Sequence, residues 1–422
     1  MEATRIRLAE GVHLTYLPAR KFKTSLLSAQ FVTPLRRETA GANALLAAVL
    51  RRGTVSCPDM GALSAKMDNL YDASIDYTVR KKGENQCVGF VASFIDDRYA
   101  PDGERLLEPA AALLGELICD PVTYHGRFVP EYFESEKTNL LEAIRSLIND
   151  KRDWADSRLL RALCDGEAYA VPRLGDEETV DKLQALKVYT QYRDLISTAP
   201  LEIIYSGSAG LERVKQALAA AFATLPREEV RVISTAAPHV CRESVQYVED
   251  VLDVTQGKLG MGFSCGSDDM PALLMGNTLF GGSSNSKLFL NVREKLSLCY
   301  YASSLYHRQK GLITVSSGIE FQNYQRAYDE IMAQLEAVQK GELEDWELEG
   351  ARSTLLNSYA TVGDSQGKLE NFYLGQAATG QHETPADLAR AIQDMTAERI
   401  CRAMSTVKLD TVYFLKGKEA EA

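Results

Sequence analysis

Hydrophobic residues follow a similar pattern in the two halves of the chain. Residues 11–17 alternate between apolar and polar positions, which predicts a half-buried strand, and the Ala- and Leu-rich residues 42–52 predict a buried helix. In the second half, the matching helix is expected at residues 270–280 and ends at Gly281 and Gly282, where glycine permits a positive φ. The pattern therefore predicts one buried helix early in each half.

The elements after this helix also recur in order: a second helical stretch, two strands, two long amphipathic helices, and a closing strand. In the first half these segments are residues 60–70, 74–79, 86–94, 103–119, 129–148 and 201–206. In the second half they are residues 287–296, 302–306, 312–319, 322–338, 342–359 and 409–415. This order predicts an α+β fold, an α/β sandwich in which each half is an antiparallel-rich sheet covered by helices.

Short sequence matches point to an internal duplication. Three pairs of segments match in the same order, two of them at one offset: residues 44–46 with 272–274, 80–83 with 308–311, and 197–205 with 405–413. A fold repeated at this period is the simplest account of the shared order. We predict two homologous domains, residues 1–228 and 229–422, joined by a polar, proline-containing linker at residues 225–238.

Composition narrows the class of protein. The 422 residues are 45% hydrophobic and 25% charged, as expected for two ordinary soluble domains. The net charge of −11 disfavours binding to nucleic acid or to an anionic membrane. The apolar run at residues 44–50 is far shorter than the roughly 20 residues of a membrane span. We therefore expect a cytoplasmic protein, with its eight widely spaced cysteines reduced.

One segment resembles the second-domain signature of the insulinase-like (pitrilysin-type) zinc metallopeptidases. A loop that begins with Gly281 and Gly282 leads into a helix with Arg293-Glu-Lys and then to Tyr300, with Ser297 where the family usually has Gly. The resemblance implies that Arg293, Tyr300 and the glycine loop contact a bound peptide. The same two side chains could instead hold their helix against a neighbouring strand.

The first half lacks the residues that the resemblance would require for catalysis. Active members of the family carry His-x-x-Glu-His on a helix, in which the histidines bind zinc and the glutamate activates water. Ala44, Ala47 and Ala48 stand at those positions, between Gly41 and a Gly-Thr pair. Glu142 resembles the family's third ligand, although a solvated helix carboxylate is the simpler interpretation. One carboxylate cannot hold zinc with useful affinity, so we expect no zinc and no catalysis by this chain alone.

Cofactor motifs are also missing. The loop at residues 281–287 lacks the glycine that precedes lysine in a phosphate-binding P-loop, and Gly260-x-Gly262 lacks the spacing of a dinucleotide fingerprint. No cofactor is therefore expected.

The resemblance implies a two-domain half-clamshell that binds peptide or unfolded polypeptide without cutting it. Such a chain would be the peptide-binding or regulatory partner of an active homologue in a hetero-oligomer. Two alternatives remain open: a non-proteolytic homodimeric scaffold, and an active zinc endopeptidase with atypical ligands.

Overall fold

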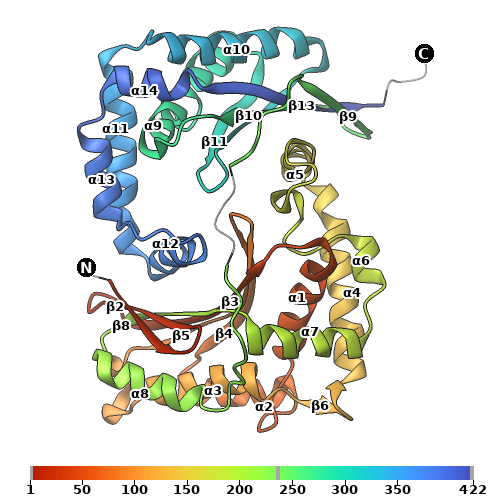
Figure 1. Ribbon diagram of the computed structural model, residues 1–422, viewed down its shortest axis with the longest axis vertical. Coiled ribbons are helices and arrows are strands. Elements are labelled where there is room, and N and C mark those ends of the chain that lie inside the picture. The colour runs from red at the N-terminus through yellow and green to blue at the C-terminus, as the bar shows by residue number, and fades with distance from the viewer. Residues whose placement is uncertain (1–2, 234–237, 419–422) are drawn as a thin grey trace. The chain divides into compact units, whose positions relative to one another are not determined.

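The computed structural model describes residues 3–233 and 238–418 (Figure 1). Each of its two compact units is assembled from three stretches of chain. The first unit comprises Met1–Arg145, Val171–Thr235 and Gly363–His382, and the second comprises Ser146–Ala170, Ala236–Val362 and Glu383–Ala422. The domain ranges 1–228 and 229–422 rest on the repeat within the sequence, and they stay predictions. Part of the expected linker 225–238, residues 234–237, lies outside the described residues.

The first unit is built on a six-stranded sheet in the order β1-β2-β8-β3-β5-β4. Its strands are β1 (Thr4–Ala9), β2 (Val12–Pro18), β3 (Thr24–Pro34), β4 (Ser74–Lys82), β5 (Asn85–Ile95) and β8 (Leu201–Gly207). Neighbouring strands are antiparallel, except that β2 and β8 run parallel. Strand β4 therefore forms one edge of the sheet.

The second unit is built on a five-stranded sheet in the order β11-β12-β10-β13-β9. Its strands are β9 (Gln246–Leu252), β10 (Gly257–Cys265), β11 (Cys299–His307), β12 (Leu312–Ile319) and β13 (Val407–Gly417). Only β13 and β9 run parallel. Read from β4, the first sheet runs β4-β5-β3-β8-β2, which matches the second in both strand order and strand direction.

Helices cover both faces of each sheet (Figure 1). In the first unit they are α1 (Arg37–Leu50), α2 (Met60–Asp68), α3 (Leu107–Cys119), α4 (Pro130–Ser146), α6 (Glu177–Asp181), α7 (Ala185–Thr198), α8 (Leu211–Ala221) and α12 (Gln366–Ala378). In the second they are α5 (Lys151–Leu163), α9 (Met270–Phe280), the π-helix η5 (Leu288–Lys295), α10 (Tyr324–Lys340), α11 (Asp345–Ala360), α13 (Pro385–Gln393) and α14 (Ala397–Met404). The remaining elements are a small ribbon, β6 (Thr123–Tyr124) with β7 (Arg127–Phe128), and short 3₁₀ turns. The α+β class with helix-covered sheets is thus confirmed.

The two-residue period of β3 explains why its two faces carry different side chains. Leu27, Ala29 and Phe31 belong to the main hydrophobic core of the first unit. The intervening Ser28 and Gln30 are also buried, and Ser28 Oγ donates a hydrogen bond to Glu370 of α12, 2.7 Å away. One face of β3 thus builds the core, and the other receives α12 through polar contacts.

The equivalent central strand of the second sheet, β10, receives α5 through small residues instead. A side chain added at Gly260 would lie 3.2 Å from Leu159, and one added at Gly262 would lie 2.7 Å from Leu163. Glycine at these positions lets α5 pack directly on the backbone of the strand. The Gly260-x-Gly262 pair thus has a packing role.

Most predicted elements are present, with boundary differences that have local causes. The helix expected at residues 103–119 begins only at Leu107, because Asp102 and Gly103 have φ values of 51° and 73°, outside the helical range. Gly281 does not end α9 through a positive φ as expected, since its φ is −154°. A Cβ there would lie 2.7 Å from the backbone nitrogen of Ser304, so close approach requires the glycine.

The eight cysteines all lie in the described part of the chain, and none forms a disulfide. Among the described residues, no helix combines the length and the apolar character needed to cross a membrane.

Ser297, between η5 and β11, adopts the left-handed backbone conformation with a φ of 49°. This conformation is costly for a residue that carries a Cβ. We expect Ser297→Gly to raise the free energy of unfolding by about 0.5–1 kcal/mol, because relief of strain exceeds the added entropy of the unfolded chain. Denaturant unfolding would measure this change. Ser284→Gly is the matched control, since its φ is not positive, and equal effects of the two substitutions would contradict the explanation.

Candidate functional site

The candidate site begins at α1, whose residues from Ala40 to Leu50 are all buried. Ala44, Ala47 and Ala48 are 2%, 0% and 5% exposed. Such a helix buries every face because it is made of small and apolar residues packed between β4, β5 and α7. Where the active family would place two imidazoles and a carboxylate, this helix presents three methyl groups.

A cavity of about 770 Å³ lies beside these methyl groups, entirely within the first unit. Ala44 and Ala48 form part of its wall, whereas Ala47 is not among the lining residues. The other walls come from the edge strand β4, from α4, from the loop after α5 and from α12. They are lined by Tyr77, Thr78, Val79, Arg80, Lys81, Lys82, Glu136, Asn139, Leu140, Ala143, Arg173, Leu174 and Asn371.

The carboxylate that reaches this cavity is Glu136 and not Glu142. Glu142 is exposed on α4 and is not among the lining residues, whereas Glu136 and Ala143 are. Positions seven apart are two helical turns apart and share a face, while Glu142 points elsewhere. Glu142 as a vestigial ligand therefore stays a prediction, and it does not line this cavity. The seven-residue spacing on α4 is the sequence signal that could have identified Ala143 and Glu136.

The residues around the cavity do not fit a catalytic zinc ion. Among the described lining residues Glu136 supplies the one carboxylate, and no histidine or cysteine joins it. The Glu136 carboxylate already pairs with Arg52, whose Nε lies 3.0 Å from Oε1. Zinc in proteins takes three or four such ligands. The residues that line this cavity therefore do not support a metal-dependent catalytic step.

A buried ion pair supports the cavity wall at β4. Arg80 donates two hydrogen bonds to Glu370 of α12, with Nη1···Oε2 and Nη2···Oε1 distances of 2.6 and 2.7 Å. Burial by itself would lower the pKa of Arg80, but the hydrogen bonds and charge of Glu370 raise it overall. The bidentate geometry fixes Arg80 as a permanent cation that ties β4 to α12.

Next to this pair, Lys82 donates to Asn371 Oδ1 at 2.6 Å and to the Asn371 carbonyl oxygen at 3.3 Å. Burial lowers the pKa of Lys82 because it disfavours the charged ammonium. The partners of Lys82 are thus neutral, in contrast to the carboxylate that pairs with Arg80.

The four predicted peptide-contact residues all lie in the second unit. Gly281 is buried and Gly282 is exposed at the end of α9. Arg293, on η5, stacks on the Phe289 ring at 4.6 Å from its centroid and lies 3.5 Å from Glu294. Tyr300 is 64% exposed and donates a hydrogen bond of 2.9 Å to Glu320. Their contact with peptide stays a prediction.

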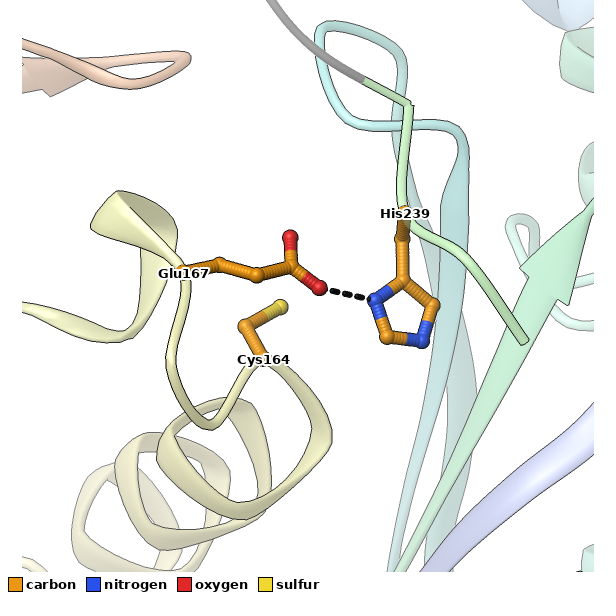
Figure 2. A group of neighbouring side chains, drawn as sticks. All are labelled: Cys164, Glu167 and His239. Atoms are coloured by element: carbon orange, nitrogen blue, oxygen red, sulfur yellow. Dashed lines mark hydrogen bonds and ion pairs between the residues drawn. The ribbon is translucent and has the colours of Figure 1, made fainter. Parts of the chain in front are cut away.

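The second unit contains a cluster of chemistry-bearing residues that no sequence motif indicates. Cys164, Glu167 and His239, in the second unit, place one donor atom each within 4.8 Å of one another (Figure 2). His239 Nδ1 lies 2.5 Å from Glu167 Oε1, and His239 Nε2 lies 3.2 Å from Asp410 Oδ2. Cys164 and Glu167 are three residues apart, but His239 comes more than seventy residues later, so no local motif could reveal the whole group.

The neighbouring Lys310 indicates that this cluster is a charge network and not a metal site. Its side chain is 1% exposed, and its ammonium forms an ion pair with Glu167 Oε2. A metal ion bound by Glu167 would lie beside this buried cation and would have to overcome its repulsion. The cluster therefore fits a charge network, in which Lys310 already supplies the positive charge that Glu167 requires.

Comparisons with known proteins agree with the signature in the sequence. The family profile described as the peptidase M16 inactive domain matches residues 182–355. A Bacillus subtilis protein named probable inactive metalloprotease YmfF is 34% identical over 416 residues, which cover 97% of this chain and 96% of that protein.

Solved structures give the same result at the level of the fold. The crystal structure of a conserved protein from Enterococcus faecalis matches with a TM-score of 0.89 and 26% identity, covering 100% of both chains. A structure described as a peptidase M16 inactive domain, from Pseudomonas fluorescens, matches with a TM-score of 0.80 at 18% identity and again covers 100% of both chains. Three alanines stand in place of the zinc motif, and a relative named as a probable inactive metalloprotease matches almost the whole chain. The chain therefore belongs to the M16 metallopeptidase family as an inactive member.

Proposed function

We propose that this chain binds an extended peptide, or a segment of unfolded polypeptide, along strand β4 and does not cut it. The observation that carries the proposal is the position of β4, which is an edge strand whose residues from Tyr77 to Lys82 line the cavity. An exposed sheet edge can pair with an added strand through backbone hydrogen bonds. The cavity gives such a strand room beside the sheet.

The outer edge of β4 offers backbone groups at alternate residues. The carbonyl oxygens of Ile75 and Val79 accept hydrogen bonds from Arg51 and Arg173, so they point away from β5. In an antiparallel ladder, the N–H and C=O of one residue point to the same side, and the side alternates along the strand. The N–H and C=O of Tyr77, which lies between them, therefore also point away from β5, toward the open edge of the sheet.

Family membership and the missing zinc ligands support a proposed role in an assembly. Because the described residues at the cavity supply a single carboxylate and no histidine or cysteine, we propose that this chain acts with a homologue that retains the zinc ligands, as its peptide-binding or regulatory partner. The matching strand orders of the two sheets also support the proposal that an ancestral domain was duplicated. Arg293, Tyr300, Gly281 and Gly282 are then candidates for further peptide contacts from the second unit.

The first prediction concerns zinc. After incubation with zinc and dialysis, we expect the chain to hold no stoichiometric zinc at the cavity and to leave peptides intact with or without chelator, because a single ion-paired carboxylate binds the metal too weakly. Elemental analysis and peptide mass spectrometry measure both outcomes. Zinc at one ion per chain that is lost in Glu136→Gln but retained in Glu142→Gln would contradict the assignment.

A second prediction concerns the edge strand. Tyr77→Pro removes an N–H that points away from the sheet, so the sheet should persist while strand addition fails. We expect an unstructured test polypeptide to bind at least about tenfold more weakly to this variant. Tyr77→Val, which keeps the N–H, is the matched control, and fluorescence anisotropy measures binding. Equal affinity of the two variants would exclude β4 as the binding edge.

The third prediction concerns the partner. The tagged full chain, isolated from a native extract, should bring with it a homologue that carries His-x-x-Glu-His, identified by mass spectrometry. The pair should cleave a peptide that neither subunit alone cleaves at the same rate. If the extract yields this chain without a homologue, and light scattering shows that it is a dimer, the partner role is rejected and the homodimeric scaffold is favoured.

A further inference from the structure

The cavity beside α1 is basic although the whole chain is acidic. Its lining includes four cationic side chains and one carboxylate, whereas the chain carries a net charge of −11. The cations are Arg80, Lys81, Lys82 and Arg173, and the carboxylate is Glu136. A concave wall with one sign of charge concentrates its field within the cavity. The site that would hold a metal cation in an active relative thus has the opposite electrostatic preference here.

Two of these charges are already compensated. Arg80 forms its bidentate pair with Glu370, and Glu136 pairs with Arg52. Neither is therefore available to a ligand without breaking an existing ion pair, which is costly when the partner is buried.

Lys82 and Arg173 have a different environment. Lys82 donates to the side chain and the backbone carbonyl of Asn371, and Arg173 Nη1 donates to the Val79 carbonyl oxygen at 3.3 Å. These acceptors satisfy hydrogen bonds but do not carry a negative charge. The lowered pKa of Lys82 agrees with a partly desolvated ammonium, which a carboxylate placed beside it would stabilise.

We infer that the cavity selects acidic peptides, and that a carboxylate of the bound strand lies against Lys82 and Arg173. This inference rests on the proposed peptide binding along β4 and specifies its ligand class. Arg173 presents a planar fork suited to a carboxylate, and Lys82 presents a compact charge on the strand that forms the edge. The carboxylate comes either from Asp and Glu side chains or from the C-terminus of the peptide.

Three short fluorescent peptides separate these sources. All alternate valine with a second residue: the first has glutamate and an amidated C-terminus, the second has glutamine and an amidated C-terminus, and the third has glutamine and a free C-terminus. We expect one of the carboxylate-bearing peptides to bind the full chain about tenfold more tightly than the neutral peptide at low salt. Higher salt should reduce this preference, because it screens the charges.

Charge-removing variants locate the effect. Lys82→Gln and Arg173→Gln should each lower the ratio of acidic-peptide affinity to neutral-peptide affinity about fivefold. Lys187→Gln and Arg193→Gln make the same changes at exposed positions outside the cavity, and should leave both affinities unchanged. Thermal unfolding of each variant checks that it folds.

The outcomes distinguish the two proposals. If the neutral peptide binds as tightly as both carboxylate-bearing peptides, acidic selectivity is wrong while peptide binding stands. If the acidic preference persists in Lys82→Gln and in Arg173→Gln, the cavity is not its source and the inference is overturned. If none of the peptides binds, the proposed function itself fails.

Discussion

The burial of α1 is the constraint on which the rest of the site depends. Its alanines allow the helix to pack tightly between the sheet and α7, and their methyl groups have no capacity to bind a metal or activate water. Ala47 is fully enclosed, so a larger polar side chain there would require room and hydrogen-bond partners that the core does not offer, whereas Ala44 and Ala48 border the cavity. Packing and the loss of catalytic chemistry are therefore two consequences of the same residues.

In each unit a helix also packs on the face of the sheet opposite the main core. Different interactions hold this helix in the two units. On the first sheet, α12 is held through the buried Arg80–Glu370 pair and the hydrogen bond from Ser28. On the second, α5 packs its leucines on glycines of β10. A buried ion pair contributes orientation more than net stability, because desolvation offsets much of its attraction. The first arrangement therefore fixes the cavity wall, while the second chiefly buries apolar surface.

The second unit also contains a network of charged side chains. Glu167 lies between the His239 imidazole and the Lys310 ammonium, and Asp410 lies between His239 and Arg242, whose Nη1 is 2.6 Å from the aspartate. Such a network satisfies buried charges by pairing each carboxylate with a cation. It resembles a metal site in its residue types and in the closeness of its donor atoms. The buried lysine is what makes it an ion-pair network.

The sequence by itself determined the element order, the α+β class and the loss of the zinc motif, because these depend on local periodicity and on residue identity at Ala44, Ala47 and Ala48. Tertiary structure decided which carboxylate on α4 meets the cavity, why Gly281 must be glycine, and how Cys164, Glu167 and His239 meet. It also decided that Lys82 and Arg173 line the cavity beside α1. The physical reason is that these features arise from contacts between residues distant in the chain, and sequence periodicity carries information only about neighbours along one element.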